Sequence, residues 1–70
     1  MEKTVIKIDG MMCSMCETHI NEAIRKNFPG CKVKSNRRKK ESVILSREAL
    51  DRDAVKKVIE ATGYTFLGIE

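Results

Sequence analysis

Hydrophobic and polar positions alternate at the start of the chain. Thr4, Ile6 and Ile8 lie two positions apart in a run rich in β-branched residues. Side chains at this spacing share one face of an extended strand, so that face can be buried. The pattern predicts a strand over residues 4–8 that ends at Asp9-Gly10.

The spacing of the apolar residues becomes helical after this strand. Ser14, with Glu17 three positions later, is a candidate capping box, and Pro29-Gly30 is expected to end the helix. A helix is therefore predicted from about residue 14 to residue 28. Its apolar positions are Cys16, Ile20, Ala23, Ile24 and Phe28.

The second half of the chain repeats the strand and helix patterns. Residues 31–35 and 41–45 are β-prone and flank a polar link, which predicts a hairpin with a charged tip. A helix over residues 52–62 follows, with Asp51 at its N-cap and Gly63 at its C-cap. The apolar stripe of this helix consists of Val55, Val58, Ile59 and Thr62. The last predicted strand covers residues 64–69.

The predicted order of elements is strand, helix, strand, strand, helix, strand. This is the order of the split βαβ arrangement. We therefore predict an α+β fold, a ferredoxin-like βαββαβ sandwich with a four-stranded antiparallel sheet and two helices on one face. A chain of this length supports only one modest core, so residues 1–70 are expected to form a single domain.

Composition excludes several classes of protein. In 70 residues with three aromatic side chains and no tryptophan, a large enclosed active site is not expected. No segment approaches the roughly 20 apolar residues of a membrane helix, so no membrane insertion is expected. The N-terminus lacks the apolar stretch of a secretory signal, and three cysteines argue against a disulfide framework. These features predict a cytoplasmic protein with free thiols.

Most of the net charge of +4 lies between residues 32 and 40. Its centre is the run Arg37, Arg38, Lys39 and Lys40 in the predicted hairpin tip. Such a run is most often a solvated tip, and it can also steer the chain toward an acidic partner. Aromatic residues that would stack on bases are not interleaved with these cations, so nucleic acid is not an expected partner.

Two thiols lie three positions apart in the sequence, between the first predicted strand and the first predicted helix. Cys13 and Cys16 are therefore placed at a helix N-terminus, where unpaired amides and the helix dipole favour the thiolate form. Soft thiolates select Cu(I), zinc or iron–sulfur clusters, or they carry out redox chemistry. The pair alone leaves these possibilities open.

The motif and the element order together resemble those of the heavy-metal-associated domains. This family contains small copper chaperones and the metal-binding domains of copper P-type ATPases. The resemblance covers essentially the whole chain. It rests on Gly10, Met11, Cys13 and Cys16 in the motif, on Ile20 and Ile24, on Pro29-Gly30, and on the closing Ala61-Thr62-Gly63-Tyr64.

The resemblance implies that Cu(I) is held between the sulfurs of Cys13 and Cys16 and passes to a similar domain by ligand exchange. Met11 would be a buried methionine that supports the loop, and Tyr64 an aromatic neighbour of the site. Zinc-selective relatives often carry aspartate just before the first cysteine, where this chain has Met12. The implied partner is a copper-transporting P-type ATPase or a related metal-binding domain.

Coordination chemistry also favours Cu(I) over zinc. Structural zinc usually takes four ligands, and one Cys-x-x-Cys pair supplies two. Cu(I) accepts fewer and softer ligands, although Zn, Cd, Hg and Ag ions remain possible cargo. Of the two thiols, we expect Cys16 in the first helical turn to have the more depressed pKa and Cys13 to be the more mobile ligand.

Four further residues near or outside the motif have open roles. His19 lies three residues after Cys16 and is expected to be a solvent-facing helix position or a metal-induced dimer contact, and less often a ligand. Cys31, where the resembled family usually has a small aliphatic residue, is expected in the core of the second strand. Met12 and Met15 are either an apolar docking rim or ordinary loop residues.

Several functions share these local features. The first is a metal-binding carrier, present as a free chaperone or as an excised ATPase domain. A mercury- or zinc-binding homologue of the same fold is an alternative, and a thiol–disulfide oxidoreductase is less favoured because its domain is longer and its strand order differs. No nucleophile, base and orienting group form a catalytic set, so we expect no enzyme. A metal-bridged homodimer is also predicted.

Overall fold

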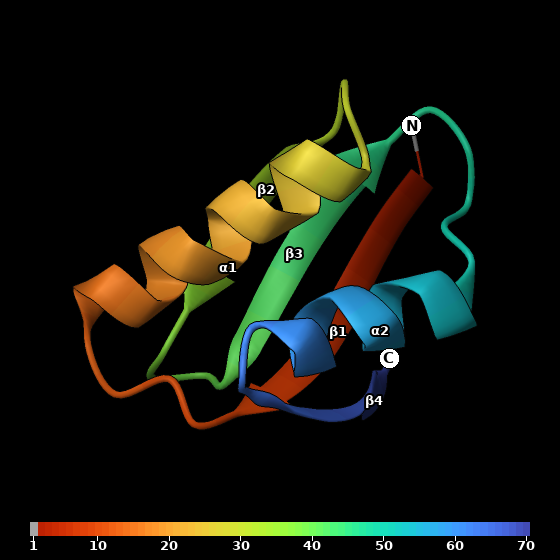
Figure 1. The fold of residues 1–70 in the computed structure, drawn as a ribbon. Coiled ribbons are helices and arrows are strands. Elements are labelled where there is room, and N and C mark those ends of the chain that lie inside the picture. Colours follow the sequence, from red (N-terminus) through yellow and green to blue (C-terminus); the bar gives the residue numbers. More distant parts are fainter. Residues whose placement is uncertain (1) are drawn as a thin grey trace.

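The computed structural model describes residues 2–70, and Met1, the first residue of the predicted domain, lies outside the described residues. Six elements follow one another in the predicted order (Figure 1). They are β1 (Glu2–Asp9), α1 (Ser14–Asn27), β2 (Lys32–Asn36), β3 (Glu41–Ser46), α2 (Arg52–Ala61) and β4 (Thr65–Ile69).

The four strands form one antiparallel sheet in the order β2-β3-β1-β4. Figure 1 shows both helices on the same face of this sheet. The ferredoxin-like βαββαβ sandwich predicted from the sequence is therefore confirmed. Because β1 lies between β3 and β4, the segment that leaves its C-terminal end starts from the middle of the sheet.

Aliphatic side chains between the sheet and the helices form the core. On α1, Ile20 and Ile24 are fully buried one turn apart, and on α2 the same spacing buries Val55 and Ile59. Each fully buried side chain of this size contributes roughly 1.5–3 kcal/mol relative to an exposed one. The strands supply Ile6, Ile8, Val33 and Ile44, and the loop after β1 supplies Met11.

The predicted capping box at Ser14 is wrong. The N-cap of α1 is Cys13, and no side chain there makes a capping hydrogen bond. The carboxylate of Glu17 does not turn back to the helix start, because it accepts two hydrogen bonds from Arg37. A tertiary contact has thus replaced the local one.

The ends of the second helix follow the sequence prediction closely. Asp51 is the N-cap of α2, although its side chain makes no capping hydrogen bond. The helix ends at Ala61, one residue before the predicted end, and Gly63 adopts a positive φ of 92° directly after it. This left-handed geometry, which glycine adopts without steric cost, turns the chain into β4.

Cys31 lies just before β2 and not within it as predicted. Its side chain is half-buried and packs against the edge of the core. Within residues 2–70, no helix has both the length and the hydropathy needed to cross a membrane.

Candidate metal centre

The segment Gly10–Cys13, here called the metal loop, connects the central strand β1 to α1. The chain enters it at Gly10, which has a φ of 102°. A Cβ atom on this residue would also lie 3.3 Å from Cδ1 of Tyr64. Glycine is therefore required twice here, for the left-handed backbone and for the close approach of the Tyr64 ring.

Two neighbouring methionines in the metal loop have opposite surroundings. Met11 is 7% exposed and belongs to the core cluster, so it fastens the loop to the interior. Met12 is 84% exposed, and Met15 in the first turn of α1 is 66% exposed. Met11 thus anchors the loop to the core, while the side chains of Met12 and Met15 are exposed to solvent near the thiols.

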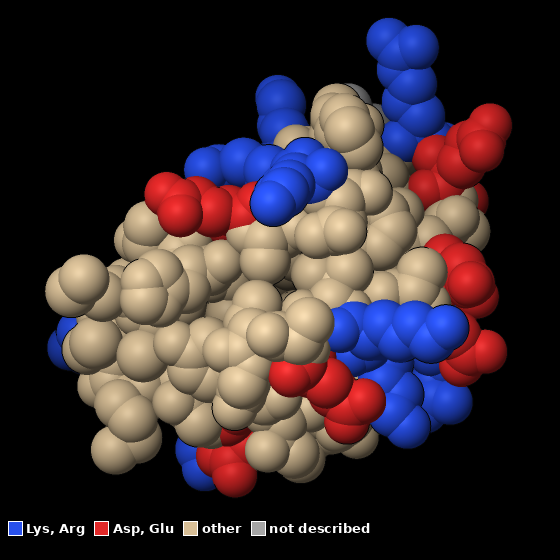
Figure 2. Space-filling view, in the orientation of Figure 1, with Lys and Arg blue, Asp and Glu red and all other residues tan. Residues whose placement is uncertain are grey.

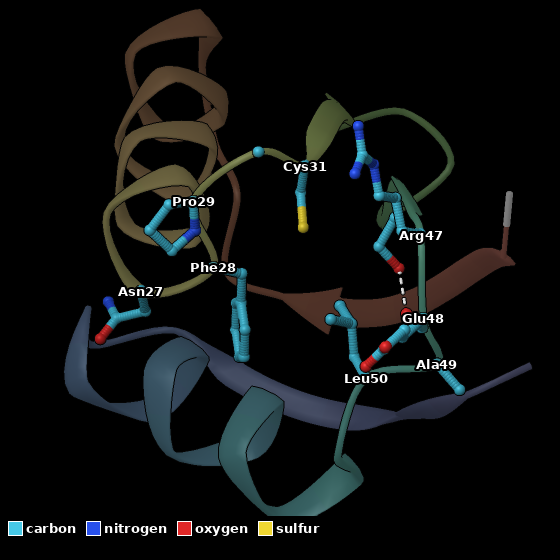
Figure 3. Close-up of a pocket in the computed structure, with 10 residues that line it drawn as sticks. Asn27, Phe28, Pro29, Cys31, Arg47, Glu48, Ala49 and Leu50 are labelled. Carbon is cyan, nitrogen blue, oxygen red and sulfur yellow. Dashed lines mark hydrogen bonds between the residues drawn. The ribbon is translucent and has the colours of Figure 1, made fainter.

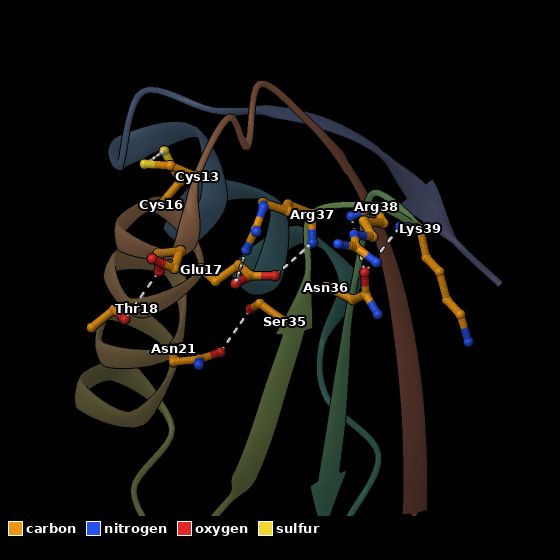
Figure 4. A network of polar contacts seen from close by, with 11 residues as sticks. Cys13, Cys16, Glu17, Thr18, Asn21, Ser35, Asn36, Arg37, Arg38 and Lys39 are labelled. Carbon is orange, nitrogen blue, oxygen red and sulfur yellow. Dashed lines mark hydrogen bonds and ion pairs between the residues drawn. The ribbon is translucent and has the colours of Figure 1, made fainter.

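Cys13 and Cys16 lie together at the start of α1 (Figure 4). Cys13 is exposed at the N-cap and Cys16 is half-buried in the first turn, where its backbone N–H donates to the Cys13 carbonyl at 3.1 Å. Their Sγ atoms are 3.7 Å apart, and both cysteines are free. This separation is well beyond a disulfide bond of about 2.05 Å.

The sulfur separation fits a chelated ion with a bent geometry. With the Zn–S bond length of about 2.3 Å, an ion bound to sulfurs 3.7 Å apart would make an S–metal–S angle of about 107°. A strictly linear ion with the same bonds would require the sulfurs to be about 4.6 Å apart. A bent pair leaves one side of the ion open to a further ligand.

The surroundings of Cys16 favour its thiolate. Hydrogen bonding from the Tyr64 hydroxyl is the largest cause that lowers the pKa of Cys16 from 9.0 to about 7, and backbone N–H groups of Met12 and Cys13 add to it. The same contact raises the pKa of Tyr64 to about 12, because the phenol must keep its proton to donate it. The direction for Cys16 agrees with the sequence expectation, and the leading cause is Tyr64.

No third His, Cys, Asp or Glu side chain is grouped with the two thiols in the described part of the chain. Among residues 2–70, no three His, Cys, Asp or Glu side chains are grouped so as to hold a metal ion. His19 is exposed on α1 and belongs to no such group with Cys13 and Cys16. Of these four residue types, the site therefore offers the two thiols of Cys13 and Cys16 within residues 2–70.

Cys31 lies far from this pair, in a hollow of about 620 Å³ at the opposite end of the sheet (Figure 3). The hollow lies between the end of α1 and the segment that follows β3, and Figure 3 shows the Cys31 sulfur pointing into it with Phe28 and Leu50 on its walls. The structure thus separates the third cysteine from the other two.

The tip of the β2–β3 hairpin, residues 37–40, lies at the same end of the sheet as the metal loop (Figures 1 and 4). The backbone N–H of Arg37 donates to Glu17 Oε2 at 2.7 Å, and its Nη1 donates to Glu17 Oε1 at 3.1 Å. On the other side, the N–H of Ile8 donates to the carbonyl of Lys40 at 2.9 Å. The tip is therefore fastened to both α1 and β1.

The hairpin tip is also shaped from within. The Asn36 side-chain oxygen accepts hydrogen bonds from the backbone N–H groups of Arg38 and Lys39 at 2.9 and 3.1 Å. Lys40 has a φ of 55°, which completes the turn. The cationic side chains of Arg38 and Lys39 are exposed, and the tip that carries them is not a loose loop.

The metal loop and the first residues of α1 carry no charged side chain of their own. Residues 10–16 contain none, and Figure 2 shows a broad uncharged area at the lower left, over this loop and the start of α1. The exposed Met12 and Met15 contribute to this area. An apolar surface around the thiols is thus bordered by the basic hairpin tip.

Comparison with known proteins identifies the fold. No family model matches the chain, and no curated protein matches it by sequence. Among solved structures, a copper-binding domain from HMA7, a P-type ATPase, has 22% sequence identity and a TM-score of 0.79, with 100% of this chain and 99% of that chain covered.

Two further structures show the same likeness. The Synechocystis copper chaperone Atx1 has 20% identity and a TM-score of 0.76 over 94% of this chain and 97% of that chain. The yeast copper transporter domain Ccc2a, solved in apo and Cu(I)-loaded states, has 24% identity and a TM-score of 0.73 over 97% and 93%. The resemblance predicted from the sequence is confirmed at the level of the fold.

The structure sharpens one prediction for the site and overturns another. Tyr64 was predicted as an aromatic neighbour that supports the site without being a ligand, and its hydroxyl is the leading influence on the pKa of Cys16. Glu17 was assigned to a capping box, whereas it binds the hairpin tip. The spacing of Ser14 and Glu17 pointed to a local partner, and nothing in the sequence pattern pointed to Arg37.

Proposed function

We propose that this protein is a cytoplasmic carrier of Cu(I), which binds the ion through Cys13 and Cys16 and passes it to a partner by ligand exchange. The observation that carries the proposal is the accessible pair of sulfurs 3.7 Å apart, with no third His, Cys, Asp or Glu grouped beside it in residues 2–70. Soft thiolates and a low coordination number suit Cu(I).

Exchange follows from the openness of the site. A thiolate of the partner adds to the open side of the bent ion, and one of the two original sulfurs then leaves. Cys13 is the expected first leaving ligand because it is exposed at the N-cap, whereas Cys16 is held by neighbouring donors. Two-sulfur binding and transfer are thereby compatible.

The proposed partner is a copper-transporting P-type ATPase or a related metal-binding domain. The copper-binding domain of HMA7 and the yeast domain Ccc2a share the fold of this chain, which supports a partner of similar shape. We assign docking to the exposed Met12 and Met15, with the tip cations Arg37, Arg38, Lys39 and Lys40 at the border of the contact. Arg37 is partly engaged by Glu17, so Arg38 and Lys39 are the freer cations.

A competition series under reducing conditions tests the binding proposal. A chromogenic Cu(I) chelator is titrated against the native protein, the Cys13→Ser/Cys16→Ser variant and the Cys31→Ser variant. The native protein and Cys31→Ser are expected to withdraw Cu(I) from the chelator equally, while the double variant withdraws none. Unchanged affinity in the double variant would reject the proposed site.

The same series with Zn, Cd, Hg and Ag ions addresses the choice of cargo. Met12 offers no hard oxygen ligand, and two thiolates leave a tetrahedral zinc ion half-coordinated. We therefore expect Cu(I) to displace Zn. A preference for Zn or Hg at equal concentrations would favour the alternative of a zinc- or mercury-binding homologue of the same fold.

Redox catalysis is the competing function of a different class, and we propose that the protein is not an enzyme. The Sγ atoms are within reach of a disulfide after a small movement, so reversible oxidation is expected. Insulin reduction in the presence of dithiothreitol separates the two functions. Turnover at the rate of a thioredoxin, together with weak Cu(I) binding, would replace the carrier proposal.

Loading is also proposed to produce a metal-bridged homodimer, because the exposed thiols of two copies can share ions. Size-exclusion chromatography with and without one equivalent of Cu(I) tests this proposal, and His19→Ala tests the histidine as a dimer contact. The expected result is an earlier elution of the loaded protein at high concentration. An unchanged elution volume would contradict the dimer alone and leave the carrier function intact.

A further inference from the structure

The charges of this protein are unevenly divided between its two faces. The two helices together with the Asp51 cap carry five cationic and five anionic side chains, as the mixed colours over them in Figure 2 indicate. Strands β1 to β3 with the hairpin tip carry eight cationic and three anionic ones. The excess positive charge thus lies mainly in the hairpin tip, with four cationic and three anionic side chains on strands β1 to β3 themselves.

The face of the sheet opposite the helices has a defined arrangement of lysines. Leu45 on β3 pairs with Lys3 on β1 and with Lys32 on β2, and these three residues alternate with the ones that point into the core. Partners at one register position point to the same face of a sheet. Lys3 and Lys32 therefore flank Leu45, about 10 Å apart across the three strands.

The next row of the same face has a lysine on the β2 side only. Val43 on β3 pairs with Val5 on β1 and Lys34 on β2. Lys3, Lys32 and Lys34 are all exposed, and none of the ion pairs among residues 2–70 includes them. The result is a half-buried aliphatic centre with exposed ammonium groups on both sides.

The acidic groups near this face are already engaged. Glu41 contacts the Lys7 ammonium at 3.2 Å and Glu70 contacts it at 3.7 Å. The carboxylate of Asp9 lies 3.9 Å from Lys40. The unpaired side-chain charges that remain on the face and at the tip are positive, so a partner there must be anionic.

We propose that this open sheet face is an electrostatic docking surface for an anionic membrane. Its unpaired cations are lysines on the two strands that flank β3, Lys3 on β1 and Lys32 and Lys34 on β2. Lysine is a strongly hydrated point charge that suits a diffuse layer of lipid phosphates. Protein interfaces are depleted in lysine and enriched in arginine and aromatic residues, which this face lacks on its strands. The same lack of aromatic residues disfavours stacking on nucleic acid bases.

The geometry gives this docking a use beyond the proposed carrier function. The metal loop lies at one end of the sheet and the helices cover its other face (Figure 1). A chain lying with its open face on lipid therefore keeps the two thiols at the rim of the contact. Adsorption then limits the search for a membrane-embedded partner to the membrane surface.

Vesicle sedimentation tests the proposal with the reduced apo protein. Vesicles of phosphatidylcholine are compared with vesicles that contain about 30% phosphatidylglycerol. Binding is measured at an ionic strength of about 0.1 M or lower, where the Debye length is about 10 Å or longer, and again in high salt. Binding to the anionic vesicles alone, and its loss in high salt, is expected. No binding to anionic vesicles at low salt would overturn the proposal.

Two charge-matched variants separate position from net charge. Lys3→Gln/Lys32→Gln/Lys34→Gln removes three cations from the sheet face, and Lys26→Gln/Lys56→Gln/Lys57→Gln removes three exposed cations from the helices. We expect the sheet variant to bind anionic vesicles at least about tenfold more weakly and the helix variant to bind nearly as well as the native protein. Equal losses in both variants would reject a defined docking face.

Two controls complete the experiment. Circular dichroism establishes that both variants fold, and the substituted positions are all exposed. The Cys13→Ser/Cys16→Ser variant should bind vesicles like the native protein, so failure of the metal site and failure of the membrane face give different results. Binding of a polyglutamate peptide without binding of vesicles would assign the face to an acidic protein and overturn the membrane proposal.

Discussion

The two ends of the sheet hold the three thiols of this protein in opposite settings. At one end, the sulfurs of Cys13 and Cys16 lie 3.7 Å apart, with Cys13 exposed and Cys16 half-buried. At the other end, Cys31 points alone into a hollow of about 620 Å³. The larger cavity and the chemically competent pair are thus at different places.

The difference shows what the proposed transfer site requires. An enclosed cavity holds a ligand by surrounding it, whereas an ion that must leave with a partner has to remain reachable by a second pair of thiols. The metal loop meets this demand because Met11 and Tyr64 support it from below and nothing covers it among the described residues. The hollow at Cys31 is therefore not a guide to the position of the thiol pair, which lies at the other end of the sheet.

The largest expected effect comes from the thiols themselves. Replacement of Cys16 by serine removes one of two ligands and should weaken Cu(I) binding on the order of a thousandfold, about 4 kcal/mol. Cys31→Ser should change the affinity less than about threefold, since it supplies no ligand. Chelator competition on both variants measures this contrast. A similar loss in Cys31→Ser would break the distinction between the two ends.

The second prediction compares the apolar supports of the two ends. Met11→Ala empties a buried position and should lower the free energy of unfolding by about 2–5 kcal/mol. Leu50→Ala at the half-buried wall of the hollow should cost about 1–2 kcal/mol, because less surface is lost. Urea denaturation of both variants measures the difference, and a larger cost at Leu50 would contradict it.

The third prediction concerns pH. Tyr64→Phe removes the hydroxyl that is the largest cause of the lowered pKa of Cys16, so this pKa should rise from about 7 toward 9.0. Iodoacetamide alkylation of Cys16, followed against pH in a Cys13→Ser/Cys31→Ser background, measures this shift. An unchanged alkylation profile would assign the lowered pKa to the backbone donors alone.

The sign of the linked stability effect follows from the same pKa. The thiolate of Cys16 is stabilised in the folded state, so its contribution is complete above the ordinary pKa of 9.0 and is lost as the pH falls through about 7. Cu(I) affinity should fall over the same range, since binding displaces the thiol protons. Tyr64→Phe should move both dependences to higher pH.

The smallest expected effect is the loss of stability when the contact between Glu17 and Arg37 is weakened. Glu17→Gln keeps one acceptor for Arg37 but removes the charge, and should lower the free energy of unfolding by about 1 kcal/mol or less because the pair is partly exposed. Glu22→Gln on the exposed side of α1 is the matched control and should change stability very little. Thermal unfolding of the two variants checks this difference.

The sequence pattern predicted the order of the elements and the fold, because both depend on local alternation and on aliphatic stripes. Thr4, Ile6 and Ile8 are buried on one face of β1 as the spacing implied, and Gly63 ends α2 with a positive φ. Helix and strand bounds differ by one or two residues at most elements. Frayed ends explain differences of this size.

Contacts between distant segments were not predictable in this way. Glu17 had the local spacing of a capping residue, yet its partner Arg37 lies 20 positions away, and only the fold brings the two together. Cys31 had the composition of a strand residue, yet the turn after Pro29-Gly30 leaves it before β2. In both cases tertiary packing decided between local alternatives.

The contact between Glu17 and Arg37 also has a consequence for local opening. It joins the first turn of α1 to a hairpin whose other strand is hydrogen-bonded to β1. Fraying of the helix start must therefore detach the hairpin tip as well. Local unfolding at the thiols then involves more of the chain, and the opened state is less populated. Amide hydrogen exchange at the helix start should accordingly be slow for a terminus, which keeps the two sulfurs in register during long intervals without metal.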